Sequence, residues 1–134
     1  MSNQLHVHSY PSLKAITAAG VMSGLLAYGG ITLTHNGSRV AEIWLPNALI
    51  LAVVLRGRGL GALAYLPAAF GANVVADIFV GDDWLRAIGL SLANSLEIMI
   101  VWLALRRLAM SRPDMGKLTD LAVFALLAGL IAPL

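Results

Sequence analysis

The sequence predicts an all-α integral membrane protein, a polytopic helical bundle of about five transmembrane helices. Of its 134 residues, 59% are hydrophobic and only 12% are charged, about half the charged share of a typical soluble domain. The apolar residues are gathered into runs of roughly bilayer length. The nine Lys and Arg residues lie at the ends of those runs. So few polar side chains could not cover a surface that faces water.

Five apolar runs predict helices near residues 15–34, 41–55, 60–80, 85–105 and 119–134. A cleaved signal peptide is the alternative for the first run. Its apolar core would have about 7–15 residues, and this run is longer. The last run continues to Leu134. We therefore expect residues 1–134 to form one transmembrane domain that is incomplete at its C-terminus.

Pro46 and Pro67 are expected to have structural roles. Pro46 falls near the beginning of the second predicted helix, where its missing N–H costs nothing. Trp44, two residues earlier, suits the aromatic belt at a membrane interface, so we expect the helix to enter the membrane there. Pro67 falls inside the third predicted helix, and we expect it to kink that helix.

Small residues recur on two of the predicted helices. Gly20 and Gly24 are four residues apart on the first, and residues 68–72 of the third are rich in Ala and Gly. Small side chains let membrane helices approach closely. We expect both groups to serve helix packing.

The distribution of Lys and Arg predicts the orientation of the chain. Alternate connections on one side carry seven of these residues: Lys14, Arg56, Arg58, Arg106, Arg107, Arg112 and Lys117. The other side carries two, Arg39 and Arg86. Because cytoplasmic loops are enriched in Lys and Arg, we expect a cytoplasmic N-terminus.

The composition argues against several kinds of site. There are no cysteines, which excludes disulfides and thiolate chemistry. The glycines of residues 57–61 resemble a phosphate-binding loop only in spacing, since no strand precedes them and no Lys-Ser/Thr follows. His6 and His8 lie in a short polar tail and are expected to be solvated. We expect no metal, no cofactor, no catalytic residue and no nucleic acid partner.

Five polar side chains within the predicted spans stand out, because amide and carboxyl groups are costly there and each is therefore a candidate for function. Asn73 and Asp77 share one face of the third helix, and Asn94 and Glu97 share one face of the fourth. Asn47 lies early in the second helix, in its outer half. We expect these faces to turn toward one another and form one polar cluster that opens to the outer side.

Glu97 is the strongest candidate for ligand binding or signalling. An ionised carboxylate at the membrane midplane costs several kcal/mol without a partner, and no basic residue of the sequence lies at matching depth. Glu97 is therefore either protonated or partnered by a ligand or another helix. For the asparagines, the alternative is ordinary hydrogen bonding between helices, worth about 0.6 kcal/mol on average. Asp77 lies one turn from the outer end of its helix, so we expect a solvated carboxylate.

Several motifs, in their order and spacing, resemble the first class of bacterial membrane-associated sensor domains, called MASE. They are Ile43-Trp44-Leu45-Pro46-Asn47-Ala48, the turn Arg56-Gly57-Arg58, the stretch from Pro67 to Asn73, Ala93-Asn94-Ser95-Leu96-Glu97, and Arg106-Arg107. The positions that match the family pattern are Trp44, Pro46, Asn73, Asn94 and Glu97. Asn47 departs from it, since a small or hydroxyl residue is common there.

The resemblance implies a sensory input domain in the bacterial inner membrane, with about eight helices, an even number that returns the chain to the cytoplasm. A cytoplasmic output domain would follow it, a histidine kinase, a diguanylate cyclase or a phosphodiesterase. The expected partners are the lipid bilayer, a small ligand or membrane partner protein, and a second copy in a homodimer.

Two alternatives stay open from the residues alone. A helix broken by Pro46 beside a midplane acid also suits a fragment of a small-solute transporter or channel. A scaffold that only oligomerises is the other alternative, and it would depend on its interface glycines rather than on Glu97.

Overall fold

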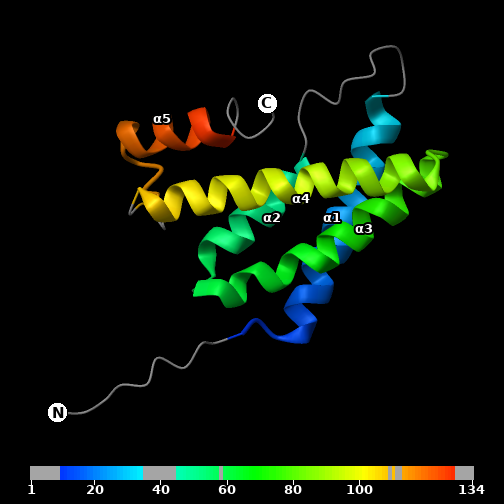
Figure 1. Ribbon diagram of the computed structural model, residues 1–134, viewed down its shortest axis with the longest axis horizontal. Helices are drawn as coiled ribbons and strands as arrows, with labels where there is room; N and C mark the ends of the chain where they lie inside the picture. Colours follow the sequence, from blue (N-terminus) through cyan, green and yellow to red (C-terminus); the bar gives the residue numbers. More distant parts are fainter. Residues whose placement is uncertain (1–9, 35–44, 58, 109, 111–112, 129–134) are drawn as a thin grey trace.

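The computed structural model describes residues 10–34, 45–57, 59–108, 110 and 113–128, and most of these are helical (Figure 1). The elements are α1 (Leu13–Thr34), α2 (Leu45–Arg56), the 3-10 helix η1 (Gly59–Ala64), α3 (Tyr65–Val80), α4 (Trp84–Arg107) and α5 (Leu118–Leu126). No strand occurs among the described residues. The predicted all-α fold class is therefore confirmed.

Three stretches are long and apolar enough to cross a membrane: Leu13–Leu33, Leu60–Val80 and Trp84–Arg107. Large apolar side chains point outward from them, with Leu33 82% exposed and Phe79 78% exposed. Such a surface suits lipid rather than water. The helix α2 is also apolar but shorter, and its 12 residues extend only about 18 Å.

The helices α1 and α3 pack on each other more extensively than any other pair. A Cβ at Gly20 would lie 3.1 Å from Cβ of Ala68, and one at Gly24 would lie 3.1 Å from Cβ of Ala72. The two contacts have the same offset along the chain, so the helices run in the same direction. The expected packing role of Gly20 and Gly24 is confirmed, because an added Cβ at either position would make a contact tighter than an ordinary van der Waals contact.

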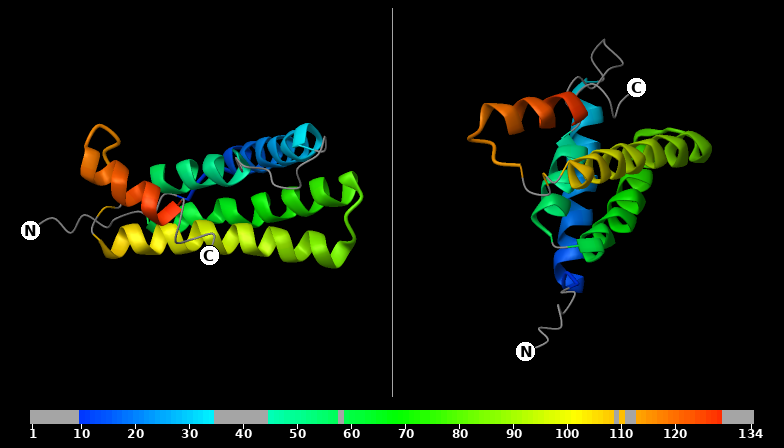
Figure 2. Two further views of the ribbon diagram at one scale, coloured as in Figure 1. Left: turned by 90° about the horizontal axis from the view of Figure 1, so that it is seen from above. Right: turned by 60° about the vertical axis from the view of Figure 1, so that its left-hand side comes forward.

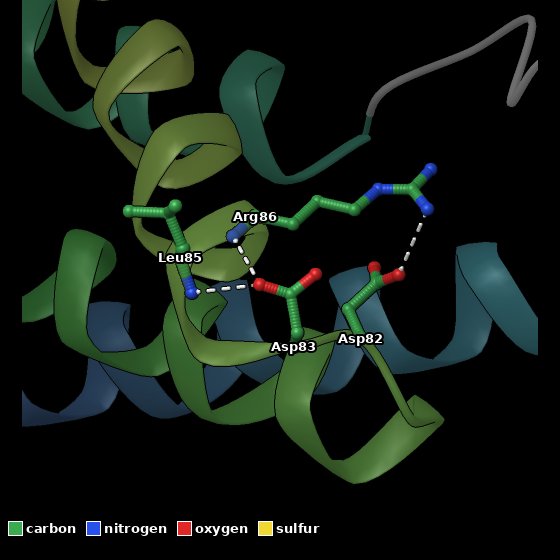
Figure 3. Close-up of polar contacts among 4 residues, drawn as sticks. All are labelled: Asp82, Asp83, Leu85 and Arg86. Carbon is green, nitrogen blue, oxygen red and sulfur yellow. Dashed lines mark hydrogen bonds and ion pairs between the residues drawn. The ribbon is translucent and has the colours of Figure 1, made fainter.

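The helices α3 and α4 form an antiparallel hairpin (Figure 2, left). Gly81 ends α3 in the left-handed conformation, with φ of 102°, which glycine adopts without strain. Asp83 then caps α4, and its Oδ1 accepts hydrogen bonds from the backbone N–H groups of Leu85 and Arg86 at 3.0 and 3.1 Å (Figure 3). Asp82 and Arg86 form an ion pair of 3.3 Å beside this cap.

Pro67 lies in the first turn of α3 and not inside one continuous helix. The expected kink is replaced by a junction, because residues Gly59–Ala64 form η1 and α3 begins at Tyr65. In a first turn the N–H groups lack intrahelical partners, so a proline there breaks no hydrogen bond. Pro46 is the second residue of α2, as the sequence predicts, and it is buried.

The apolar core lies between α2, η1, α3, α4 and the end of α5, toward the end of the hairpin remote from the α3–α4 turn. Its buried members are Ile50, Leu51, Val54, Ala62, Ala69, Ile98, Val101, Trp102, Leu105 and Leu127. The Arg106 guanidinium stacks on the Trp102 ring at this end, with Cζ 4.7 Å from the ring centroid. The core thus joins α2 to the second half of α4.

Candidate functional site

Two helices bring together three of the polar side chains that the sequence singles out. Asn47 comes from the first turn of α2, while Asn94 and Glu97 come from the middle of α4. The side-chain Nδ2 of Asn47 donates to Oε2 of Glu97 at 2.8 Å and to Oδ1 of Asn94 at 3.3 Å. We call these three residues the α2–α4 cluster.

The α2–α4 cluster lies near the middle of the span that α4 forms. Glu97 is about 20 Å along α4 from Trp84 and about 15 Å from Arg107. Because Asn47 bonds to Glu97, the first turn of α2 lies beside the middle of α4. Trp44, the expected interfacial residue, lies outside the described residues.

The position of the first turn of α2 bears on the charge of Glu97. The first N–H groups of a helix have no intrahelical partner, and they carry the positive end of the helix dipole. The Glu97 carboxyl group is bonded to a side chain of that turn. The contact between this turn and the carboxyl group is thus the hydrogen bond from the Asn47 amide, and no cation among the described residues pairs with Glu97.

The α2–α4 cluster retains unused hydrogen-bonding capacity. All three side chains are half-buried, and Oδ1 of Asn47 is buried without a hydrogen-bond partner in the described part of the chain. No ion pair to Glu97 occurs among the described residues. An unpaired acceptor beside an uncompensated carboxyl group is a place where a hydrogen-bond donor or a positive charge can bind.

Asn73 does not join the α2–α4 cluster. Its Oδ1 accepts a hydrogen bond of 3.1 Å from Oγ of Ser23 on α1, and Asn73 is only 4% exposed. Among the described residues no hydrogen bond connects Asn73 with Asn94 or Glu97. The single polar cluster expected from the sequence is therefore divided, because α3 turns Asn73 toward α1.

Asp77 also differs from its expected surroundings. The sequence predicts a solvated carboxylate near the outer end of α3, but Asp77 is only 2% exposed. It lies where α3 packs against α4, close to the hydroxyl group of Ser91. Nearness to the helix end did not expose Asp77, because the hairpin folds α4 across that face.

Ser23 and Ser91 are polar residues at these contacts that the sequence reasoning missed. Both are fully buried. Each stands among small residues on a buried helix face: Ser23 lies between Gly20 and Gly24, and Ser91 lies one turn after the buried Ala87. A serine within a small-residue face of a membrane helix is the signal that could have found them.

Comparison with known protein families identifies the chain. A family model, MASE1, matches residues 16–134. This chain belongs to the MASE1 family. The match includes α2, α3 and α4, so the resemblance to the first class of MASE domains is confirmed. Searches of curated proteins and of solved structures found no match.

Membership of MASE1 defines the general role of the chain. MASE1 is a family of membrane-associated sensor domains, not a family of enzymes. The expectation of a sensory module in a membrane is confirmed at this level. The residues through which this MASE1 chain senses have to be argued from its own geometry.

Proposed function

We propose that this MASE1 chain is the sensory input module of a bacterial signalling protein in the inner membrane, and that the α2–α4 cluster detects the signal. One observation carries the proposal. Asn47, at the mid-depth beginning of a short helix, donates a 2.8 Å hydrogen bond to the uncompensated Glu97 of a spanning helix. Breaking this bond is costly if the Glu97 carboxyl group is left without a donor. A ligand that offers another donor can replace Asn47 at little net cost.

The proposed mechanism is a competition for the Glu97 carboxyl group. A hydrogen-bond donor on a small ligand, a lipid or a partner helix would replace Asn47 at Glu97. The signal would then bind one packing of α2 on α4 better than another, and the population would shift toward the better-bound packing. A coupling of about 1–3 kcal/mol is enough for a useful switch.

We further propose that the output is a cytoplasmic histidine kinase or cyclic-di-GMP enzyme attached to this domain. The arrangement of charges supports a cytoplasmic position for one end of the bundle. Because α1 and α3 run opposite to α2 and α4, the basic residues at their termini meet at that end: Lys14, Arg56, Arg106 and Arg107. Such an end is typical of the cytoplasmic side.

The proposal is tested by substituting Glu97 in the full-length protein with its native output domain. Glu97→Gln keeps the side-chain shape and can still pair with Asn47, whereas Glu97→Ala removes the pair. We expect both variants to reach the membrane at wild-type levels and to lose the response to signal, with the output locked on or off. Leu96→Ala is the matched control, since Leu96 is the exposed neighbour of Glu97 on α4.

The opposite result would assign Glu97 a structural role. If Glu97→Gln signals like the wild type while Glu97→Ala disappears from the membrane, the carboxyl group serves only as a hydrogen-bonding contact between helices. Membrane levels by immunoblot and output activity have to be measured in the same cells, because a lost protein also gives a lost output.

One observation favours a fragment of a small-solute transporter or channel as the second candidate. The first turn of α2 lies at mid-depth beside a carboxyl group, an arrangement that transporters use at their substrate sites. Under this alternative, purified chain in sealed vesicles would conduct or exchange solute, and Glu97→Gln would abolish that flux. A sensor module would show no flux with either variant.

A further inference from the structure

A second polar site lies between α3 and α4 near their turn, apart from the α2–α4 cluster. Asp77 belongs to the last turn of α3, and Ser91 to the second turn of α4. Asp77 is 2% exposed and Ser91 is 0% exposed. Oδ2 of Asp77 and Oγ of Ser91 both lack a hydrogen-bond partner in the described part of the chain, although the two groups are near enough to interact. Two buried oxygen atoms on facing helices therefore have no partner in the described part of the chain apart from each other.

The described neighbours of Asp77 balance its charge only in part, since Arg86 attracts the carboxylate and Asp82 repels it. Arg86, the basic residue at this end of the hairpin, pairs with Asp82 at 3.3 Å, and its side chain is 60% exposed. Asp82 itself adds negative charge near Asp77. In α1, which packs on the other side of α3, the charged residue is Lys14, at the opposite end of the bundle. Among the described residues, the cation that attracts the Asp77 carboxylate is thus Arg86, which is already paired with Asp82.

The last turn of α3 adds a negative contribution at Asp77, which the positive beginning of α4 at the same end of the hairpin offsets in part. The C-terminal turn of a helix carries the negative end of its dipole, and Asp77 lies in that turn of α3. Asp83 lies just beyond it as the N-cap of α4. These groups together disfavour an unpaired anion at Asp77 and favour the capture of a positive charge.

We propose that Asp77 and Ser91 bind one small monovalent cation, a proton or a sodium ion, between α3 and α4. Either ion neutralises the carboxylate and gives both unpaired oxygens a partner. A proton on Asp77 lets the carboxyl O–H donate to Oγ of Ser91, whereas a sodium ion is ligated by both oxygens. A divalent metal fits poorly, because the described residues hold no group of three or more Asp, Glu, His or Cys that could bind one.

Cation binding at this site makes the stability of the α3–α4 hairpin depend on the sodium concentration or the pH of the medium. The bound cation joins the two helices through their facing side chains. Loss of the cation leaves a buried, unpaired charge, which favours an opened hairpin that lets water reach Asp77. The packed hairpin is therefore stabilised by sodium, or by low pH if the ion is a proton, because a ligand stabilises the form that binds it.

The test is the thermal unfolding of the purified full chain in lipid nanodiscs. One arm raises sodium chloride against choline chloride at constant ionic strength and pH. The other arm lowers the pH without sodium. We expect the wild-type midpoint to rise in one of the two arms, which identifies the ion. We expect Asp77→Asn to show no cation-dependent rise in that arm, because its side chain is neutral and can donate to Ser91 itself.

Two serine variants separate binding from general packing. Ser91→Ala should shift the half-saturating cation concentration by roughly tenfold, the effect of losing one bond to a charged group. Ser95→Ala is the matched control on the same helix, since its Oγ already donates to the backbone carbonyl of Ser91 at 2.9 Å. The proposal is overturned if neither arm stabilises the wild type more than Asp77→Asn, or if Ser91→Ala and Ser95→Ala titrate alike.

Discussion

A single amide group organises the α2–α4 cluster. Both hydrogens of Asn47 Nδ2 are used, one for Glu97 and one for Asn94, while the amide oxygen is left without a partner. Removing this side chain therefore leaves two acceptors on α4 without their donor. Because lipid supplies no other hydrogen-bond donor, we expect this loss to weaken the packing of α2 on α4.

The coupling between Asn47 and Glu97 can be measured with a double-mutant cycle. We expect Asn47→Ala and Glu97→Ala to interact by about 0.6–1.7 kcal/mol, the range found for hydrogen bonds between membrane helices. The measurement is reversible unfolding in mixed micelles for the wild type, both single variants and the double variant. A cycle of Asn47→Ala with Ser95→Ala serves as the control and should give no coupling. Equal values for the two cycles would contradict the observed bond.

At the scale of helices, the contact between α1 and α3 decides which polar groups meet. Gly20 and Gly24 let α1 lie against Ala68 and Ala72, and this contact rotates α3 so that Asn73 meets Ser23. Asp77, one turn further along α3, is buried where α3 packs against α4. The packing of small residues thus determines the polar contacts on either side of α3.

Two glycines of α1 provide a matched test of this contact. A Cβ at Gly20 would lie 3.2 Å from the backbone oxygen of Ala68, whereas one at Gly29 would meet nothing within 4 Å. Both substitutions to Ala gain helix propensity, up to about 1 kcal/mol. We expect Gly29→Ala to be neutral or stabilising and Gly20→Ala to destabilise by about 1–3 kcal/mol through overpacking.

The measurement is again unfolding in mixed micelles, together with cross-linking of cysteines placed at Ser23 and Asn73. Cross-linking reports the distance between α1 and α3 directly. If Gly20→Ala and Gly29→Ala have the same stability and the same cross-linking yield, α1 does not approach α3 as closely as the structure has it.

At the scale of the whole molecule, the two ends of the bundle differ in charge. The α3–α4 turn carries Asp82 and Asp83, and the opposite end carries Arg56, Arg106 and Arg107. We expect the basic end to face the cytoplasm. The proposed cation site, close to the α3–α4 turn, would then meet the outer medium.

Orientation is tested by cysteine labelling, which the chain permits because it contains no native cysteine. We expect Asp82→Cys to react with a membrane-impermeant maleimide added to intact cells, and Arg107→Cys to react only after the membrane is opened. The reverse pattern would contradict a cytoplasmic N-terminus. Labelling of both positions in opened membranes is the control for their accessibility.

The fold class and the family could be predicted without a structure. A lipid environment constrains the composition of each span locally, so apolar runs, terminal charges and small-residue motifs are visible along the chain. The sequence predicts that Asn47 and Glu97 belong to one polar cluster, since both are polar groups within predicted spans. The alignment of the first turn of α2 with the middle of α4 could not be predicted, because it depends on how the two helices pack.

The polar contacts themselves were settled by tertiary packing. Residue spacing shows that Asn73 and Asp77 share a face of α3, but not which helix that face meets. The answer depends on how α3 is rotated about its own axis. Contacts between residues far apart in the sequence, such as Gly20 with Ala68, determine this rotation. The same packing joined Asn73 to α1 and buried Asp77 against α4, because a helix has one rotation and all of its side chains share it.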